Sequence, residues 1–509
     1  MLLAEWKSDI LLILLLCSSG SDLAGSYVGI NIGTQTSNLP PAADIVSILR
    51  TQQIKHVRLF DADHRMLHAL ANTGIEVVVG VPNDQVLQIG NSQSQAADWI
   101  NKNVAPFVPA TRIAYIAVGD EILTTFSNAN ATQVLVPAMQ FLHSALLAAN
   151  LNFQVKISSP QSMDMIPKHF PPSTATFNSS WNSVMEQLLR FLKTTGASFM
   201  LNAQPYYGYT EGEGVFPLEY ALFQPLKQSS QMVDPDTDLH YLNMFDAMVD
   251  AAYYSMQSLN FSGISVMVTS SGWPSLGGAT EPDANMDNAL AYNSMLIGRA
   301  LNGSGTPSRS NSSVSIYLHE LFSEDLLPGP VSAKNWGVFA SNGTALYPLN
   351  FGHLVKSSSN STGLVGIFCV ANSRANSDDL KKGLDWACGP GSANCTAIQP
   401  GQPCYQANNL EALASYAYND YYHRTQANGG TCIFGNTAMV TTTDPSHGSC
   451  IFAGRSGSSS SSNTSGGSTT SSAFGPGDAL SQASKLQLVC LNKNLLYQHQ
   501  ARRNKQMAI

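Results

Sequence analysis

The sequence predicts an α/β chain: a (β/α)₈ TIM barrel followed by a small, disulfide-rich α+β module. Between Tyr27 and Phe351, short apolar runs alternate with longer helical patterns, and this alternation is typical of a parallel sheet covered by helices. The stretch is long enough for such a barrel, which usually takes about 250 residues. Six of the eight cysteines then crowd between Cys369 and Cys450, and the segment from Tyr27 to Phe351 contains none.

The barrel prediction rests on eight apolar, β-branched runs, each separated from the next by a helical pattern. They occupy residues 27–32, 56–60, 76–81, 113–118, 153–158, 199–203, 264–269 and 315–321. An open, doubly wound sheet is the alternative architecture. No GxGxxG fingerprint follows the first run, so the barrel is favoured.

Shifts in composition divide the chain into five segments. We expect a signal peptide at 1–25, the barrel at 26–352, a linker at 353–366, the cysteine-rich module at 367–453 and a disordered Ser/Thr/Gly-rich tail at 454–509. A buried helix is the alternative for the apolar run at 10–17. A glycolipid anchor needs a longer apolar stretch than 486–491, so we expect no anchor on this chain.

Charge and glycosylation motifs indicate the compartment. Charged residues make up only 12% of the chain and its net charge is -8, which disfavours nucleic acid as a partner. Nine Asn-x-Ser/Thr motifs favour a secreted, extracellular or cell-wall glycoprotein. They are at Asn130, Asn178, Asn260, Asn302, Asn311, Asn342, Asn360, Asn394 and Asn463.

The cysteine cluster predicts disulfides in an oxidising compartment. Its members are Cys369, Cys388, Cys395, Cys404, Cys432 and Cys450. A zinc site is the alternative, although no paired CxxC spacing is present. The pairing stays open, because six cysteines can pair in many ways.

Carboxylates at the carboxyl ends of barrel strands are candidate catalytic groups. The fourth predicted strand ends in Val-Gly-Asp-Glu, which places Asp120 and Glu121 at that edge. Burial next to an apolar strand can raise the pKa of such a carboxyl and make it a general acid. An ordinary surface glutamate is the alternative interpretation.

The motifs at these strand ends are similar to those of plant glycoside hydrolase family 17, the glucan endo-1,3-β-glucosidases. That family carries Val-Gly-Asn-Glu after strand four and Glu-(Thr/Ser)-Gly-Trp-Pro after strand seven, where this chain has Val-Gly-Asp-Glu and Ser-Ser-Gly-Trp-Pro. Segments 29–34, 57–61, 205–209 and 335–339 also match. The resemblance implies a retaining hydrolysis of β-1,3-glucan, with no cofactor and no metal. It also implies that Glu121 is the acid/base and that Ser270 occupies the position of the nucleophile.

The serine at position 270 is the most consequential departure from the family pattern. A neutral hydroxyl cannot supply the negative charge that a carboxylate nucleophile offers, and the sequence shows no histidine near Ser270 that would activate it. Further departures are Asp120 for Asn, Gln204 for Tyr, Leu327 for Lys or Arg, and Ala333 for Glu. Together they predict impaired hydrolysis.

Another carboxylate could in principle replace the missing one. Glu211 and Glu213 follow strand six, and Glu320 and Glu324 lie near strand eight. Glu324 matches a site residue of the family, so we expect it to reach the cleft. None of the four can be placed at the reacting carbon from sequence alone.

Sugar binding can survive the loss of hydrolysis. The resemblance places Asp120, Tyr206, Tyr207, Trp273 and Glu324 at the substrate, where aromatic rings can stack on glucose. The alternative is that the three aromatic side chains are core residues of the barrel rim.

The cysteine-rich segment resembles the carbohydrate-binding module of family 43, through Trp-Ala-Cys-Gly-Pro-Gly at 386–391, Gln-Pro-Gly-Gln-Pro-Cys-Tyr at 399–405 and the tyrosine-rich run at 414–422. This resemblance implies binding to β-1,3-glucan, and we name Trp386 and Tyr422 as candidate contacts. The alternative for Tyr416 and Tyr418 is a small core beside the disulfides.

Four functions therefore compete. We favour a glucan-binding cell-wall protein whose barrel is a weakened hydrolase, with callose- or laminarin-like β-1,3-glucan as its partner and no protein partner implied. The alternative is an active retaining endo-1,3-β-glucanase. A glucan-rearranging enzyme that needs an activated donor and a purely structural wall protein are the remaining hypotheses.

Overall fold

The computed structural model describes residues 25–125, 130–212, 214–224, 226, 232–352, 368–372, 375–425, 432, 434, 437–441 and 444–455. The predicted signal peptide up to residue 24, the predicted linker and nearly all of the predicted tail lie outside these residues.

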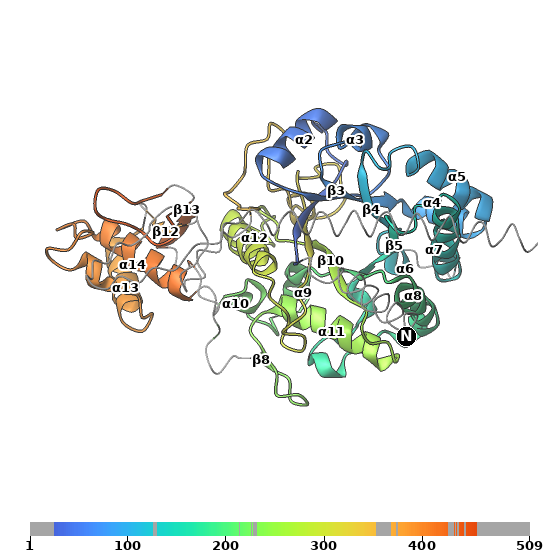
Figure 1. Ribbon diagram of the computed structural model, residues 1–509. Helices are drawn as coiled ribbons and strands as arrows, with labels where there is room; N and C mark the ends of the chain where they lie inside the picture. The colour runs from blue at the N-terminus through green and yellow to red at the C-terminus, as the bar shows by residue number, and fades with distance from the viewer. Residues whose placement is uncertain are drawn as a thin grey trace, which may run out of the picture. The chain divides into compact units, whose positions relative to one another are not determined.

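The first part is a ring of parallel strands enclosed by helices (Figure 1). The strand order is β5-β4-β3-β2-β1-β11-β10-β7-β6. The strands are β1 Val28–Ile32, β2 His56–Leu59, β3 Glu76–Val81, β4 Arg112–Val118, β5 Lys156–Ser158, β6 Pro160–Ser162, β7 Phe199–Asn202, β10 Val266–Ser271 and β11 Ile316–Leu318. Because only Ser159 separates β5 from β6, these two strands together are the fifth barrel strand and close the ring. The predicted TIM barrel is confirmed.

Helices connect the strands on the outside of the ring. They are α2 Ala42–Thr51, α3 His64–Ala69, α4 Asn83–Gly90, α5 Gln93–Asn103, α6 Ile122–Thr125, α7 Asn130–Ala148, α8 Asn182–Thr195, α9 Pro205–Thr210, α10 Leu218–Ala221, α11 Met244–Ser258 and α12 Met286–Leu301. Helix α8 shows why such segments are helical: Leu188, Leu189 and Leu192 fall on one buried face. The helix ends at Gly196, whose positive φ of 63° is a C-cap conformation that glycine adopts without strain.

The strands themselves are buried on both faces. In β3, five consecutive residues after Glu76 are buried, as expected for a strand between helices and the barrel interior. Inside the ring, Val78, Ala117, Met200 and Met267 pack with Tyr317. The interior is thus a packed core, and function is confined to the ends of the strands.

The cysteine-rich module combines helices α13 Ser377–Cys388 and α14 Leu410–Thr425 with an antiparallel pair, β12 Phe368–Ala371 and β13 Ala438–Thr441. The structure settles the disulfide pairing as Cys369–Cys432, Cys388–Cys395 and Cys404–Cys450. All six clustered cysteines are therefore in disulfides, which excludes the alternative of a cysteine zinc site.

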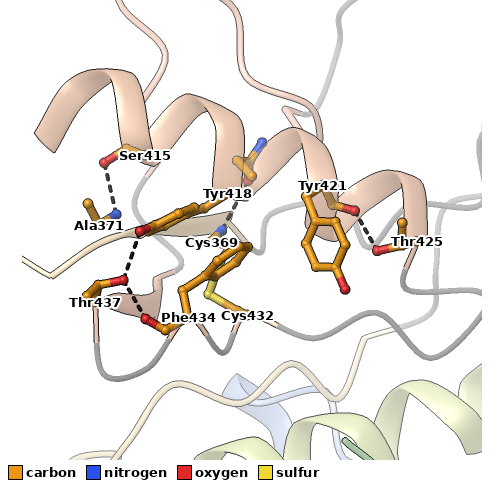
Figure 2. The surroundings of a disulfide bond; sticks show 10 residues. Cys369, Ala371, Ser415, Tyr418, Tyr421, Thr425, Cys432, Phe434 and Thr437 are labelled. Carbon is orange, nitrogen blue, oxygen red and sulfur yellow. Dashed lines mark hydrogen bonds between the residues drawn. A yellow bond between two sulfur atoms is a disulfide. The ribbon is translucent and has the colours of Figure 1, made fainter. Parts of the chain in front are cut away.

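The centre of the module is aromatic. Figure 2 shows Tyr418 of α14 lying over Phe434 beside the Cys369–Cys432 bond, with ring centroids 3.8 Å apart. The Tyr418 hydroxyl is 2.8 Å from Thr437 Oγ1. Tyr418 is thus a core residue, as the alternative interpretation of the tyrosine-rich run held.

Candidate functional site

Glu121 is held at the carboxyl end of β4 by an unusual backbone conformation. Its φ is 49°, in the left-handed region, and Gly119, two residues earlier, has φ 69°. Asn83 secures the turn, because its side chain accepts from Asp120 N at 2.7 Å and donates to Asp120 O at 2.9 Å. Left-handed non-glycine residues are uncommon and cluster at functional sites, so this turn is a good candidate for one.

The Glu121 carboxyl has the electrostatics of a general acid. Burial is the main cause that raises its pKa to about 7, the negative charge of Asp120 acts in the same direction, and a hydrogen bond from Asn202 opposes the shift. Asn202 Nδ2 donates to Glu121 Oε1 at 2.7 Å. A carboxyl with a pKa near 7 can give up or take a proton at neutral pH.

Asp120 is the centre of a charged network beside Glu121. Arg58 Nη2 lies 2.6 Å from Asp120 Oδ1, and Asn202 Nδ2 donates to the same oxygen at 3.1 Å. The other terminal nitrogen of Arg58 donates to the carbonyl of Thr269 at 3.0 Å. Arg58 therefore joins β2, the end of β4 and β10 across the top of the barrel.

Ser270 lies near the carboxyl end of β10, and only 3% of it is exposed. Its register partner on β7 is Asn202. Gln204, two residues beyond Asn202, donates from Nε2 to Ser270 Oγ at 3.1 Å. Two side-chain amides from one chain segment thus donate hydrogen bonds to the two predicted catalytic residues, Asn202 to Glu121 and Gln204 to Ser270.

The carboxylates considered as replacements for a nucleophile have different surroundings. Glu324 accepts from Gln35 N at 2.7 Å, and fully buried Glu320 faces Glu324. Burial, followed by the Glu324 charge, raises the pKa of Glu320 well above its ordinary value. Glu211 is exposed, and Glu213 lies outside the described residues. Among the described residues, no carboxylate is in hydrogen-bonding contact with Ser270.

Of the predicted aromatic contacts in the barrel, Tyr207 is the most accessible. Tyr206 is buried against Trp273 and Trp336, and Trp273 is buried with its Nε1 donating to Asp283 O at 2.8 Å. Tyr207 is half-buried, and burial raises its pKa to about 12, with smaller contributions that include the Glu121 charge. Core packing, the alternative interpretation, therefore describes Trp273 and Tyr206 better than Tyr207.

His319 is a site residue that the sequence did not predict. This residue follows β11 directly, and the centroid of its ring lies 5.4 Å from that of Trp336 and 6.4 Å from that of Phe60. Burial, together with the charge of Arg58, lowers its pKa to about 4, so it is neutral at physiological pH. Its position at a strand end was the available signal. The hydrogen-bonding contact of Ser270 among the described residues is Gln204, not this histidine.

The module exposes a tryptophan that was a predicted contact. Trp386 is 44% exposed, and its ring is held in edge contact with Tyr421 and Phe434. Tyr422, the other candidate, is only 3% exposed, and burial raises its pKa to about 12. Trp386 is thus the better placed of the two to stack on a sugar.

The glycosylation motifs lie where the chain is accessible. The structure describes the burial of six asparagines of these motifs. Asn178 is half-buried, and the exposed ones are Asn260, Asn302, Asn311, Asn342 and Asn394. The structure does not describe the burial of Asn130, and Asn360 and Asn463 lie outside the described residues.

Comparison with known proteins gives two family matches. The profile described as "Glycosyl hydrolases family 17" matches residues 28–351, and the profile described as "X8 domain" matches residues 367–439. The two matches cover most of the predicted barrel and most of the predicted cysteine-rich module.

Curated relatives match over nearly the whole chain. "Glucan endo-1,3-beta-glucosidase 4" of Arabidopsis thaliana is 54% identical over 456 residues, which is 89% of each chain. "Glucan endo-1,3-beta-D-glucosidase" of Olea europaea is 35% identical over 451 residues, 87% of this chain and 96% of the relative. Among solved structures, CJP38, a β-1,3-glucanase and allergen of Cryptomeria japonica pollen, superposes with a TM-score of 0.61 at 39% identity. That match covers 64% of this chain and 99% of the pollen protein.

Proposed function

Because this chain belongs to glycosyl hydrolase family 17, we propose that it is a secreted, cell-wall protein that binds β-1,3-glucan and hydrolyses it poorly. The names of its relatives support the choice of glucan, since each is called a glucan endo-1,3-β-glucosidase. The exposed glycosylation motifs and the three disulfides support an extracellular location.

One observation carries the proposal of impaired hydrolysis. A retaining glycosidase needs an acid and a carboxylate nucleophile about 5 Å apart, on either side of the scissile bond. Here the nucleophile position is Ser270, whose hydrogen-bonding contact is the neutral amide of Gln204. A neutral pair cannot stabilise the positive charge that develops at the anomeric carbon.

The rest of the site supports retained binding. We assign Glu121 as the remaining acid/base group, and Asp120, Tyr207 and Glu324 as groups that contact the sugar. In the module, exposed Trp386 is the proposed stacking platform for a glucan chain. We further propose that the barrel spans 26–352 and the module 367–453.

An active retaining endo-1,3-β-glucanase is the second candidate, and one observation favours it. Glu121 keeps the environment of a working general acid, with a pKa of about 7. A general acid without a nucleophile would supply only part of the rate acceleration of a retaining glycosidase, because general acid–base catalysis contributes roughly 10²–10⁴-fold.

Release of reducing sugar from laminarin by the purified chain separates the two candidates. We expect the wild type to release little or none, and Ser270→Glu to gain activity on the order of 10⁴-fold. Ser144→Glu, on the exposed face of α7, is the matched control for adding a glutamate and should gain nothing. Efficient hydrolysis by the wild type that is abolished in Glu121→Gln would overturn the proposal in favour of the active enzyme.

A further inference from the structure

A broad polar groove opens in the barrel beside the candidate site. Its volume is about 710 Å³, and ligand sites commonly take about 300–1,000 Å³. At its inner end, Thr34 follows β1, and Asp61 and Asp63 follow β2, while α4 and α5 form its outer walls. The groove therefore leads from the carboxyl ends of the strands outward into the helical layer.

The groove begins between two residues that we assign to sugar contact, Asp120 and Glu324. Groove residue Asp84 directly follows Asn83, whose side chain bonds the backbone N–H and carbonyl of Asp120. On the other side, Gln35 directly follows the groove lining at the end of β1 and donates its N–H to Glu324 at 2.7 Å. In the strand order, β3, β2 and β1 lie between β4 and β11. A glucan chain that touches both contacts would therefore meet the groove at its flank.

The lining of the groove favours a neutral ligand that is rich in hydroxyl groups. Four aspartates are accompanied by one arginine and one lysine, so an anionic ligand would be repelled. These charged residues are Asp61, Asp63, Asp84, Asp98, Arg65 and Lys102. Three apolar residues line the groove, and two of them, Ile89 and Trp99, are buried, so an apolar ligand would find little surface. Among the described residues, no group of three or more carboxylate, histidine or cysteine side chains is placed to hold a metal ion.

Both helical walls supply hydrogen-bonding groups to the groove. Trp99 Nε1 of α5 donates to Gln85 Oε1 of α4 at 3.0 Å, so the Nε2 of Gln85 is the donor left for a ligand. Gln88 of α4 and Asp98 of α5 also line the groove, and both are exposed. Such amides and carboxylates complement a sugar, because a sugar hydroxyl both donates and accepts.

We propose that this groove binds a glucosyl side branch of a branched β-1,3-glucan, while the main chain lies across Asp120 and Glu324. The inference rests on the proposed function, because it requires the main chain to bind at the strand ends. The 6-hydroxyl of glucose stands on an exocyclic carbon, so a branch there projects away from the main chain and toward the groove. The groove thus adds a specificity, namely a preference for β-1,3-glucan that is branched at the 6-hydroxyl.

The test compares two probes on the full chain by isothermal titration calorimetry: linear laminarihexaose, and the same hexasaccharide with one β-1,6-linked glucosyl branch near its centre. We expect the wild type to bind the branched probe about tenfold more tightly, as hydrogen bonds to a carboxylate and an amide would give. Replacing Gln88 and Asp98 together by alanine should abolish this preference and leave the affinity for the linear probe unchanged.

The matched control replaces Glu186 and Gln187 together by alanine, which removes one exposed carboxylate and one exposed amide from α8. This variant should keep the preference for the branched probe. Because the cysteine-rich module is identical in every variant, a change in preference reports on the barrel. Hydrogen–deuterium exchange locates the branch independently, since the branched probe should slow exchange in α4 and α5 more than the linear probe does.

The outcomes separate this inference from the proposed function. If the linear probe binds but the wild type shows no preference, or the preference survives loss of Gln88 and Asp98, the inference alone is refuted. If loss of these two side chains weakens both probes equally, the main chain occupies the groove, and the assignment to a branch is wrong. If the wild type binds neither probe, the proposed function fails, and the inference fails with it.

Discussion

Replacing Asp120 with asparagine should lower the pKa of Glu121, which is about 7, by roughly one pH unit. Asn202 Nδ2 lies 3.1 Å from Asp120 Oδ1 and 2.7 Å from Glu121 Oε1, so the carboxylates lie within about 6 Å of each other. Two unit charges at about 6 Å repel by about 3 kcal/mol at an effective dielectric constant of about 20. Arg58 and the 39% exposure of the Asp120 side chain reduce this to about 1 kcal/mol, which corresponds to the expected change.

The assay is an infrared titration of the protonated carboxyl, in which the spectrum of Glu121→Gln is subtracted to isolate Glu121. Asn202→Ala supplies a change of opposite sign, because it removes a hydrogen bond that favours the carboxylate and should raise the Glu121 pKa. Circular dichroism verifies that both variants fold. If Asp120→Asn leaves the midpoint unchanged, or raises it, the assignment of Asp120 as a source of the shift is wrong.

Three further predictions concern stability and binding. Burial raises the pKa of Glu320 in the folded chain above its ordinary value of 4.5. Glu320 therefore lowers the stability of the folded chain as the pH rises above 4.5. In calorimetry, the Tm of Glu320→Gln relative to that of the wild type should therefore increase from pH 4 to pH 8. A difference in Tm that does not change with pH would contradict this. Removing the Cys369–Cys432 bond, with a sequence separation of 63, should destabilise the module by about 4 kcal/mol, against about 2 kcal/mol for the bond with a separation of 7, as measured by denaturant unfolding. Equal losses would rule out loop length as the determinant. Trp386→Ala should weaken co-sedimentation with insoluble β-1,3-glucan about tenfold, and unchanged binding would exclude Trp386 as the platform.

Strand positions were largely predictable because buried parallel strands have a strong apolar signature. The run at 76–81 coincides with β3, since its valines are buried on both faces. The fifth strand was less predictable. It begins at Lys156, later than expected, and continues past Ser159 as β6. The interruption lies next to Pro160, which has no N–H to donate to a regular ladder.

The candidate site was only partly predictable, because its groups meet through tertiary contacts. Strand-end position pointed to Glu121, but no local pattern reveals that Asn202 holds its carboxyl or that Arg58 joins Asp120 to Thr269. His319 was missed because a single histidine has no spacing to detect, and the predicted strand 315–321 hid its position at the end of β11. The disulfide pairing also had to come from the structure, since sequence spacing leaves many pairings open.

The network around Arg58 bears on how stability and chemistry are balanced in this fold. In a hydrolase of this geometry, a third carboxylate at position 270 would stand close to Asp120 and Glu121, and one arginine would face the charge of all three. Serine removes that mutual repulsion while Arg58 keeps its bonds to Asp120 and Thr269. Active sites commonly sacrifice stability for reactivity, so the wild-type barrel should have a larger free energy of unfolding than its Ser270→Glu variant.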